Sequence, residues 1–298
     1  MTFFLPLLPL IAQVGPFTAP GTNGTPLPEP VVRPSRARAA PVTVPPPPPV
    51  RAGKAQACLD QVDDDAEAAV DSATTWLAEA KGAERPEAYL CLGMAQSRLE
   101  DWDAAIGAFL AGRDAAGADR AMRSRLGAMA GNAAMAGAKP DSALAALDTA
   151  EADAKALSDM PMLADIAIDR ARALVALHRE AEAEAALAAA RTAGPTNPEA
   201  WLLSATLARR QGKLADAQAQ IEKAADLLPI DTEIGLEAGV IAALAGHEAA
   251  ARKSWESVIK AAPDSASARI AKDYLAQLGP APADAAAPIP ATSNAKAN

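Results

Sequence analysis

The fold is indicated most clearly by residues 198–229, whose sequence is PEAWLLSATLARRQGKLADAQAQIEKAADLLP. Apolar and small side chains recur at helical spacing on both sides of Gly212, and Pro229 closes the stretch. Residues three or four positions apart lie on the same face of a helix, whereas glycine favours turns and proline stops a helix. The stretch therefore predicts a helical hairpin, that is, two helices joined by a turn that contains Gly212.

The same pattern recurs along the chain, with regular spacing in the second half and wider spacing in the first. Pro195, Pro229 and Pro263 are evenly spaced, at one repeat from each to the next. The interval lies in the range of about 20 to 50 residues that is typical of architectures in which similar units stack. We therefore expect five hairpins, whose second-helix alanines are Ala105, Ala143, Ala183, Ala217 and Ala251.

Each expected first helix carries a small residue that lets its partner helix approach closely. Four positions after each second-helix alanine comes a larger side chain, which we expect to fill the space between successive hairpins. The small residues are Gly93, Gly131, Ala171, Ala205 and Gly239, and the larger ones are Phe109, Leu147, Leu187, Ile221 and Trp255.

The first hairpin, within residues 86–114, shows the pattern in full, with Tyr89, Leu92, Gly93, Trp102, Ala105, Phe109 and Gly112. These residues resemble the tetratricopeptide repeat family, whose pattern sets an aromatic residue, leucine and glycine against alanine, an aromatic residue and alanine. The resemblance covers about residues 86–263, and Gly127 and Ala167 replace the aromatic residue in the second and third hairpins. It implies an all-α fold, a right-handed α-solenoid of stacked helical hairpins.

A solenoid needs caps, because each end of the stack exposes apolar surface. We expect the solenoid to span residues 54–279, with about five repeats plus caps. Residues 54–80 are expected to form a degenerate front hairpin, and residues 264–278 a final helix that Asp264 or Ser265 caps.

Prolines are concentrated outside the expected solenoid, and 14 of the 25 precede residue 51. The segment 15–53 also carries charged residues, namely Arg33, Arg36, Arg38 and Arg51 against Glu29. Segments 15–53 and 280–298 lack an apolar period and cannot bury enough surface to offset the entropy of ordering. We therefore expect a disordered Pro-rich basic linker at 15–53 and a disordered tail at 280–298.

Segment 1–14 contains a short apolar run, MTFFLPLLPLIA, that two prolines interrupt. The run is too short to span a bilayer. Its length fits the core of a secretory signal, although no Lys or Arg precedes it. We expect residues 1–14 to be a signal peptide or an apolar N-terminal segment, and membrane association only through it. The protein is therefore expected to be periplasmic or secreted, with a cytoplasmic protein as the alternative.

Two cysteines, Cys58 and Cys91, lie at nearly equivalent positions of successive first helices. A disulfide between them would form in an oxidising compartment and would contribute about 3 to 4 kcal/mol by the chain-entropy argument for a loop of this length. Two buried thiols are the alternative.

The residues predict no catalytic, cofactor-binding or metal site, so we expect no enzyme. Asp63, Asp64 and Asp65 lack the glycine and glutamate of a calcium loop and are expected to form a carboxylate cluster at a helix start. His178 and His247 fall in the expected turns, and no nucleophile-elbow, phosphate-loop or zinc-protease motif occurs. The net charge of −9 argues against binding to nucleic acid.

The resemblance implies that the first helices line a concave face that holds a peptide. The matching positions are Leu90, Met94, Arg98, Asn132, Met135, Ile168, Arg172, Leu202, Thr206, Arg209 and Val240. The lysine position of the family's clamp for chaperone tails holds an apolar residue in every repeat, so we expect no such clamp. Apolar residues beside Arg98, Arg172 and Arg209 favour a hydrophobic peptide that bears an acidic group. Several of the leucines and methionines could instead belong to the core.

The sequence thus predicts a non-enzymatic scaffold that binds a protein or peptide partner in the groove. The alternative is a structural or assembly factor of the cell envelope that acts through the Pro-rich basic arm at residues 16–53.

Overall fold

The computed structural model describes residues 53–280, which form thirteen helices and, within that range, no strand. The all-α prediction is therefore confirmed. Segment 1–14, almost all of segment 15–53 and the tail beyond Pro280 lie outside the described residues. The helices are α1 (Lys54–Asp64), α2 (Ala66–Glu79), α3 (Glu84–Arg98), α4 (Trp102–Ala115), α5 (Arg120–Ala136), α6 (Pro140–Leu157), α7 (Met160–Ala176), α8 (Glu180–Ala193), α9 (Pro198–Arg210), α10 (Leu214–Leu227), α11 (Thr232–Leu244), α12 (Glu248–Ala261) and α13 (Ala266–Leu278).

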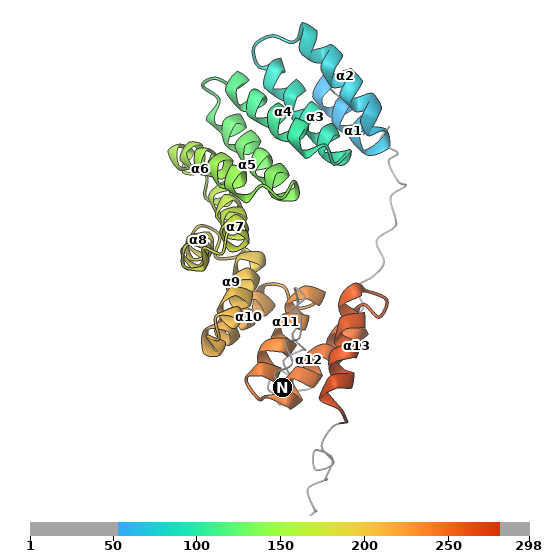
Figure 1. Cartoon of the computed structure of the whole chain (residues 1–298), viewed down its shortest axis with the longest axis vertical. Coiled ribbons are helices and arrows are strands. Elements are labelled where there is room, and N and C mark those ends of the chain that lie inside the picture. Colours follow the sequence, from blue (N-terminus) through green and yellow to red (C-terminus); the bar gives the residue numbers. More distant parts are fainter. Residues whose placement is uncertain (1–52, 281–298) are drawn as a thin grey trace, which may run out of the picture.

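The helices pair in the order that the second-helix alanines predict. α3 packs on α4, α5 on α6, α7 on α8, α9 on α10 and α11 on α12, and each hairpin packs on the next. Figure 1 shows the hairpins stacked in an arc, with α5, α7 and α11 on the inner side and α6 and α8 on the outer side. The chain is a solenoid whose first helices line the concave side.

Glycine permits the close approach of the two helices of a hairpin. A Cβ atom added to Gly93 would lie 2.5 Å from Cε1 of Phe109, and one added to Gly131 would lie 2.6 Å from Cγ of Leu147. Any larger side chain would therefore push the helices apart. Phe109 thus packs within its own hairpin, and it also shares a core cluster with Leu126 of the next hairpin, so its role is wider than the sequence suggests.

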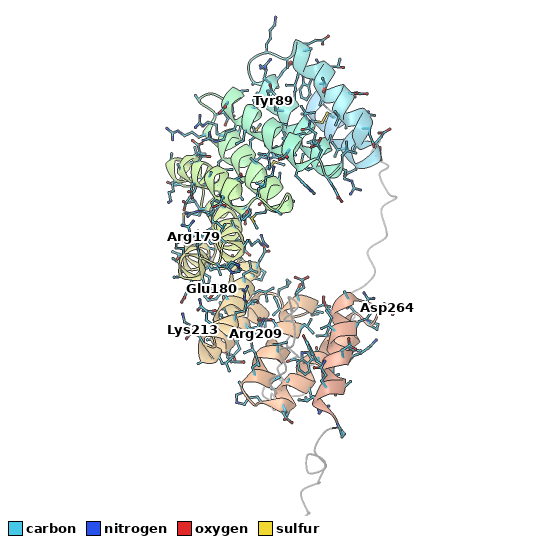
Figure 2. The ribbon with its side chains drawn as sticks, viewed as in Figure 1. Tyr89, Arg179, Glu180, Arg209, Lys213 and Asp264 are labelled. Atoms are coloured by element: carbon cyan, nitrogen blue, oxygen red, sulfur yellow. A yellow bond between two sulfur atoms is a disulfide. The ribbon has the colours of Figure 1, made fainter. Side chains whose placement is uncertain are left out.

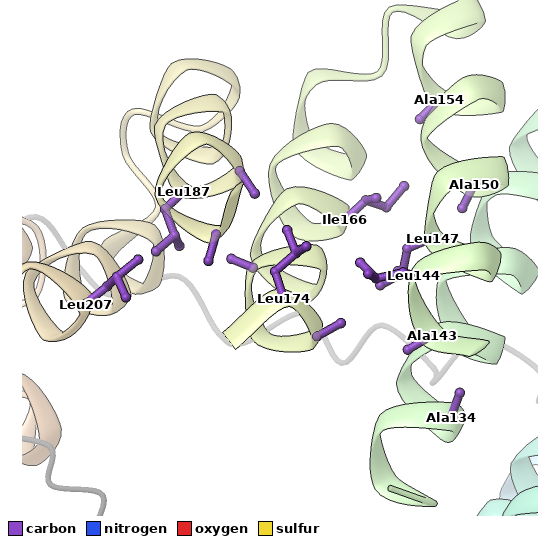
Figure 3. Packing of buried hydrophobic residues seen from close by; sticks show 14 residues of the cluster. Ala134, Ala143, Leu144, Leu147, Ala150, Ala154, Ile166, Leu174, Leu187 and Leu207 are labelled. Atoms are coloured by element: carbon purple, nitrogen blue, oxygen red, sulfur yellow. The ribbon is translucent and has the colours of Figure 1, made fainter. Parts of the chain in front are cut away.

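Alanine and leucine supply most of the buried interior. The five second-helix alanines that mark the repeats are fully buried. Figure 3 shows a cluster that runs from Ala134 through Leu147 and Leu174 to Leu187 and Leu207, and so connects α5 to α9. Because one apolar cluster crosses several hairpins, neighbouring hairpins stabilise one another.

The turn within each of the five repeat hairpins contains, at an equivalent position, a residue whose backbone has the left-handed conformation. These residues are Glu100, Ala138, His178, Gly212 and Gly246, whose φ angles range from 56° to 79°. Their spacing repeats that of the second-helix alanines. His178 therefore lies in a turn and is exposed, as the sequence predicts.

Caps cover both ends of the stack. α1 and α2 form the front hairpin, and a disulfide joins Cys58 of α1 to Cys91 of α3, whose Cα atoms are 6.1 Å apart. At the other end, the Ser265 hydroxyl accepts a hydrogen bond from the Ala268 amide at the start of α13. None of the helices within residues 53–280 is both long and apolar enough to cross a membrane.

Candidate functional site

Three residues that the sequence places in the groove are buried in the core. Leu90, Ile168 and Leu202 expose only 5%, 1% and 8% of their surface. Each first helix packs against the next first helix as well as its own partner. Leu202, for example, lies in one cluster with Ile234 of α11. These three side chains belong to the core and do not offer a contact to a ligand.

The other predicted contact residues remain at the surface of the first helices. Met94 and Met135 pack against the core with part of their side chains and leave the rest open. Methionine is unbranched and flexible, so it adapts to partners of different shape. The remaining positions are Arg98, Asn132 and Arg172, which are exposed, and Thr206, Arg209 and Val240, which are partly buried.

Arg172 is engaged by carboxylates on two successive first helices. Its Nη1 donates to Oδ1 of Asp169 at 2.8 Å, and its Nη2 pairs with Glu199 of α9. Burial raises the pKa of Asp169, and hydrogen bonds from Arg172 and Asn132 oppose this effect. Arg172 therefore has two carboxylate partners within the protein, and its side chain is still partly exposed.

Arg209 is also paired, and its partner is more deeply buried. Its Nε donates to Oε1 of Glu237 at 2.6 Å, and the two side chains expose 7% and 0% of their surface. Burial raises the pKa of Glu237, although Arg209 lowers it. Both cations thus already have internal partners, and the prediction that Arg172 and Arg209 receive an acidic group stays a prediction.

Sequence reasoning missed a set of carboxylates on the same helices. Asp165, Glu199 and Glu233 lie one repeat apart from each to the next, Asp165 in the second turn of α7 and the two glutamates in the first turns of α9 and α11. Burial and the charges of Glu199 and Asp159 raise the pKa of Asp165. Burial, Asp231 and Glu199 raise the pKa of Glu233. The three carboxylates therefore interact across the concave side, and the regular period of the repeat was the signal that could have revealed them.

We call the five carboxylates of this region the acidic face: Asp165, Asp169, Glu199, Glu233 and Glu237. Among the residues that the structure describes, only Arg172 and Arg209 form ion pairs with them. Figure 2 shows Arg209 further toward the inner side of the arc than Lys213. Three carboxylates are thus in excess over cations, and the face attracts positively charged groups.

Two further features of the described chain are a small cavity and the predicted aspartate cluster. A cavity of about 30 Å³ between α8, α9 and α10 is lined by Arg191, Ser204 and Gln211 and has room for little more than a water molecule. Asp65 caps α2, whereas Asp63 and Asp64 end α1, so the predicted helix-start cluster holds for Asp65 alone. Within residues 53–280, no group of three or more His, Cys, Asp or Glu side chains is arranged to hold a metal ion.

Comparison with solved structures identifies the architecture. PilW, described as a widely conserved type IV pilus biogenesis factor, superposes with a TM-score of 0.60 at 19% identity, over 73% of this chain and 96% of PilW. The chain has a tetratricopeptide-repeat-like fold. Pseudomonas aeruginosa pilF gives a TM-score of 0.59 at 12% identity, over 74% of this chain and 96% of pilF. BtubC from P. vanneervenii gives a TM-score of 0.56 at 14% identity, over 81% of this chain and 99% of BtubC.

No protein-family model matches the chain, and the search of curated proteins finds no match. The tetratricopeptide-repeat-like fold therefore rests on the repeat pattern, the stacked hairpins and the solved structures. At these identities the comparisons show the fold alone.

Proposed function

We propose that this protein is a non-enzymatic scaffold that binds a segment of a protein partner on its concave side. The observation that carries the proposal is the row of surface side chains on five successive first helices. Half-buried methionines occupy α3 and α5, and the acidic face occupies α7, α9 and α11, where all of its carboxylates except the buried Glu237 reach the surface. Extended peptides bind in this way when a rigid scaffold presents apolar and charged contacts in a line.

The side chains favour a partner segment with apolar residues at one end and basic residues at the other. Met94 and Met135 supply adaptable apolar contacts. The acidic face supplies uncompensated negative charge, because its five carboxylates have only two cationic ion-pair partners among the described residues, Arg172 and Arg209. This proposal replaces the expectation of an acidic peptide.

The cell envelope is the compartment that we propose. The disulfide between Cys58 and Cys91 suits an oxidising compartment. An apolar run at residues 1–12 precedes a Pro-rich linker, and PilW is described as a pilus biogenesis factor. N-terminal sequencing of the protein from fractionated cells tests this, and an intact N-terminus in the cytoplasmic fraction would contradict it.

Affinity capture from the source cell with full-length variants tests the binding face. Asp165→Lys with Glu233→Lys reverses two charges on the concave side, and we expect it to abolish capture of the main partner. Glu222→Lys with Asp226→Lys on α10 makes the same charge change elsewhere and is expected to preserve capture. Partner loss in both variants, or in neither, would contradict the proposed face.

The alternative, an envelope factor that acts through its basic arm, predicts a different result. Deletion of residues 16–53 would then abolish capture while the charge reversal on α7 and α11 would leave it unchanged.

A further inference from the structure

The chain itself contains a segment whose chemistry matches the acidic face. Residues 30–42 read PVVRPSRARAAPV, with three arginines close together and no carboxylate. The segment precedes the described residues and joins them at Gly53. Its prolines favour an extended polyproline conformation, which costs little entropy to bind.

Ion pairs show that the first helices of the acidic face lie against one another. Arg172 of α7 pairs with Glu199 of α9, and Arg209 of α9 pairs with Glu237 of α11. Asp165, Glu199 and Glu233 therefore lie on adjacent helices, in line across the concave side. Packed helices are about 8–10 Å apart.

Glu237 provides an independent sign that the acidic face lacks a donor. Its side chain is completely buried, and Oε2 has no hydrogen-bond partner within 3.5 Å in the described part of the chain, although the nearby Thr206 side chain lowers the pKa of this carboxyl. Glu237 follows Glu233 by one helical turn, so both side chains lie on the same face of α11. A buried carboxylate oxygen without a donor is costly, and a cation beside the exposed Glu233 reduces that cost through its electric field, since Oε2 of Glu237 itself is not accessible.

The spacing of the arginines fits the spacing of the helices. An extended chain rises about 3.1 Å per residue, so Arg33 and Arg36 are about 9 Å apart, close to one helix separation. Arg38 lies about 6 Å further on at the same rise, and its long side chain covers the remaining distance. The chain from Arg38 to Gly53 extends up to about 47 Å. The arm joins α1 at Gly53, and three first-helix steps, from α1 through α3 and α5 to α7, need about 30 Å, so Arg38 can reach the nearest helix of the acidic face.

We propose that residues 30–42 bind in the same molecule across α7, α9 and α11, with Arg33, Arg36 and Arg38 against the carboxylates of the acidic face. The proposal rests on the proposed function in that both use the concave side. The arm then occupies the face until a partner with basic residues displaces it, so the scaffold regulates its own access.

A spin label on the arm of the full-length chain tests this proposal. Ser35→Cys provides the one free thiol, because the two native cysteines form the disulfide. We expect the label to broaden the methyl NMR signals of Val175 on α7 and Val240 on α11, and to leave Val70 on α2 sharp. The broadening should not change on dilution and should disappear at about 1 M salt, where the Debye length is about 3 Å.

A matched pair of variants completes the test. Asp165→Asn with Glu233→Gln should abolish the broadening, whereas Glu222→Gln with Asp226→Asn, an equal charge change on α10, should preserve it. Absence of broadening, or broadening that survives the first variant, overturns the proposal. Broadening that depends on concentration shows binding by the arm of a second copy and also overturns it. These results leave the capture assay unaffected, so failure here and failure of the proposed function are distinguishable.

Discussion

At the scale of single residues, glycine decides how closely helices pack. The position of Gly131 against Leu147 leaves no space for a side chain. At Gly107, on the exposed side of α4, no described atom other than those of the adjacent residues and the surrounding helix backbone lies within 4 Å of an added Cβ. Glycine is therefore required for packing at position 131, whereas at position 107 it only weakens the helix.

We predict that Gly131→Leu lowers the free energy of unfolding by about 1–3 kcal/mol or more, because overpacking displaces Leu147 and the helix that carries it. Gly107→Leu is the control and should raise stability by up to about 1 kcal/mol, because leucine favours a helix over glycine. Urea unfolding followed by circular dichroism measures both. Equal effects at the two positions would contradict the assigned packing.

A second prediction concerns Asp165 and Glu233, whose pKa values are raised in the folded protein. A carboxyl group with a raised folded pKa stabilises the protein below its unfolded pKa and loses that contribution as the pH rises through its folded pKa. Asp165→Asn with Glu233→Gln should therefore gain stability relative to the wild type as the pH rises from about 4 to 7.

Thermal unfolding over this pH range measures the difference. The variant with Glu222→Gln and Asp226→Asn has the same change in formal charge and controls for net charge. A wild-type advantage that grows with pH would show that these carboxylates are stabilised in their charged forms.

At the scale of elements, the turn within each hairpin repeats one backbone conformation with different residues. Gly212 and Gly246 adopt positive φ without cost, whereas Ala138 and His178 adopt it with a side chain that clashes with the backbone. The turns of the second and third hairpins are therefore strained relative to those of the fourth and fifth.

Ala138→Gly should consequently stabilise the protein by about 1 kcal/mol, since it removes the left-handed penalty of about 1–2 kcal/mol at a smaller entropic cost. Gly212→Ala, the reverse change in an equivalent turn, should destabilise it by a similar amount. Melting temperatures of the two variants provide the measurement. Destabilisation by Ala138→Gly would mean that another interaction holds this turn.

The hairpins were predictable because the two helices of each hairpin can pack closely only where small residues recur, and this recurrence is visible as the period of the sequence. Gly93 and Phe109, for instance, must meet for the first hairpin to close. The depth of a side chain was less predictable, and Leu202 is buried because the next first helix covers it. The ion pairing of Arg209 was also not predictable, because its partner Glu237 lies on another helix in the next hairpin. Single-helix patterns carry no information on such pairs.

At the scale of the whole molecule, the stack depends on its ends, and the disulfide secures the front one. Cys58 and Cys91 tie α1 to α3 across the front hairpin. In a solenoid each hairpin contacts only its neighbours, so loss of one link has a local effect. Stability is therefore distributed along the arc rather than held in a single core.

Replacement of both cysteines by serine should reduce the local stability of α1 and α2 by about 3 to 4 kcal/mol, the chain-entropy value for this loop. Amide hydrogen exchange should accelerate in α1 and α2, while α11 to α13 should exchange as in the wild type. A uniform change over all helices would instead show that the solenoid unfolds as one cooperative unit.

The ion pairs between first helices have a mechanical consequence. Straightening the arc would move the first helices on its inner side apart. The ion pairs from Arg172 to Glu199 and from Arg209 to Glu237 oppose this separation and so help to maintain the curvature. The exposed ion pair at Arg172 weakens as the salt concentration rises, whereas the buried ion pair at Arg209 is screened much less. The radius of gyration in solution should accordingly depend on whether these ion pairs are formed. A ligand that binds between two first helices and breaks their ion pair would lengthen the molecule.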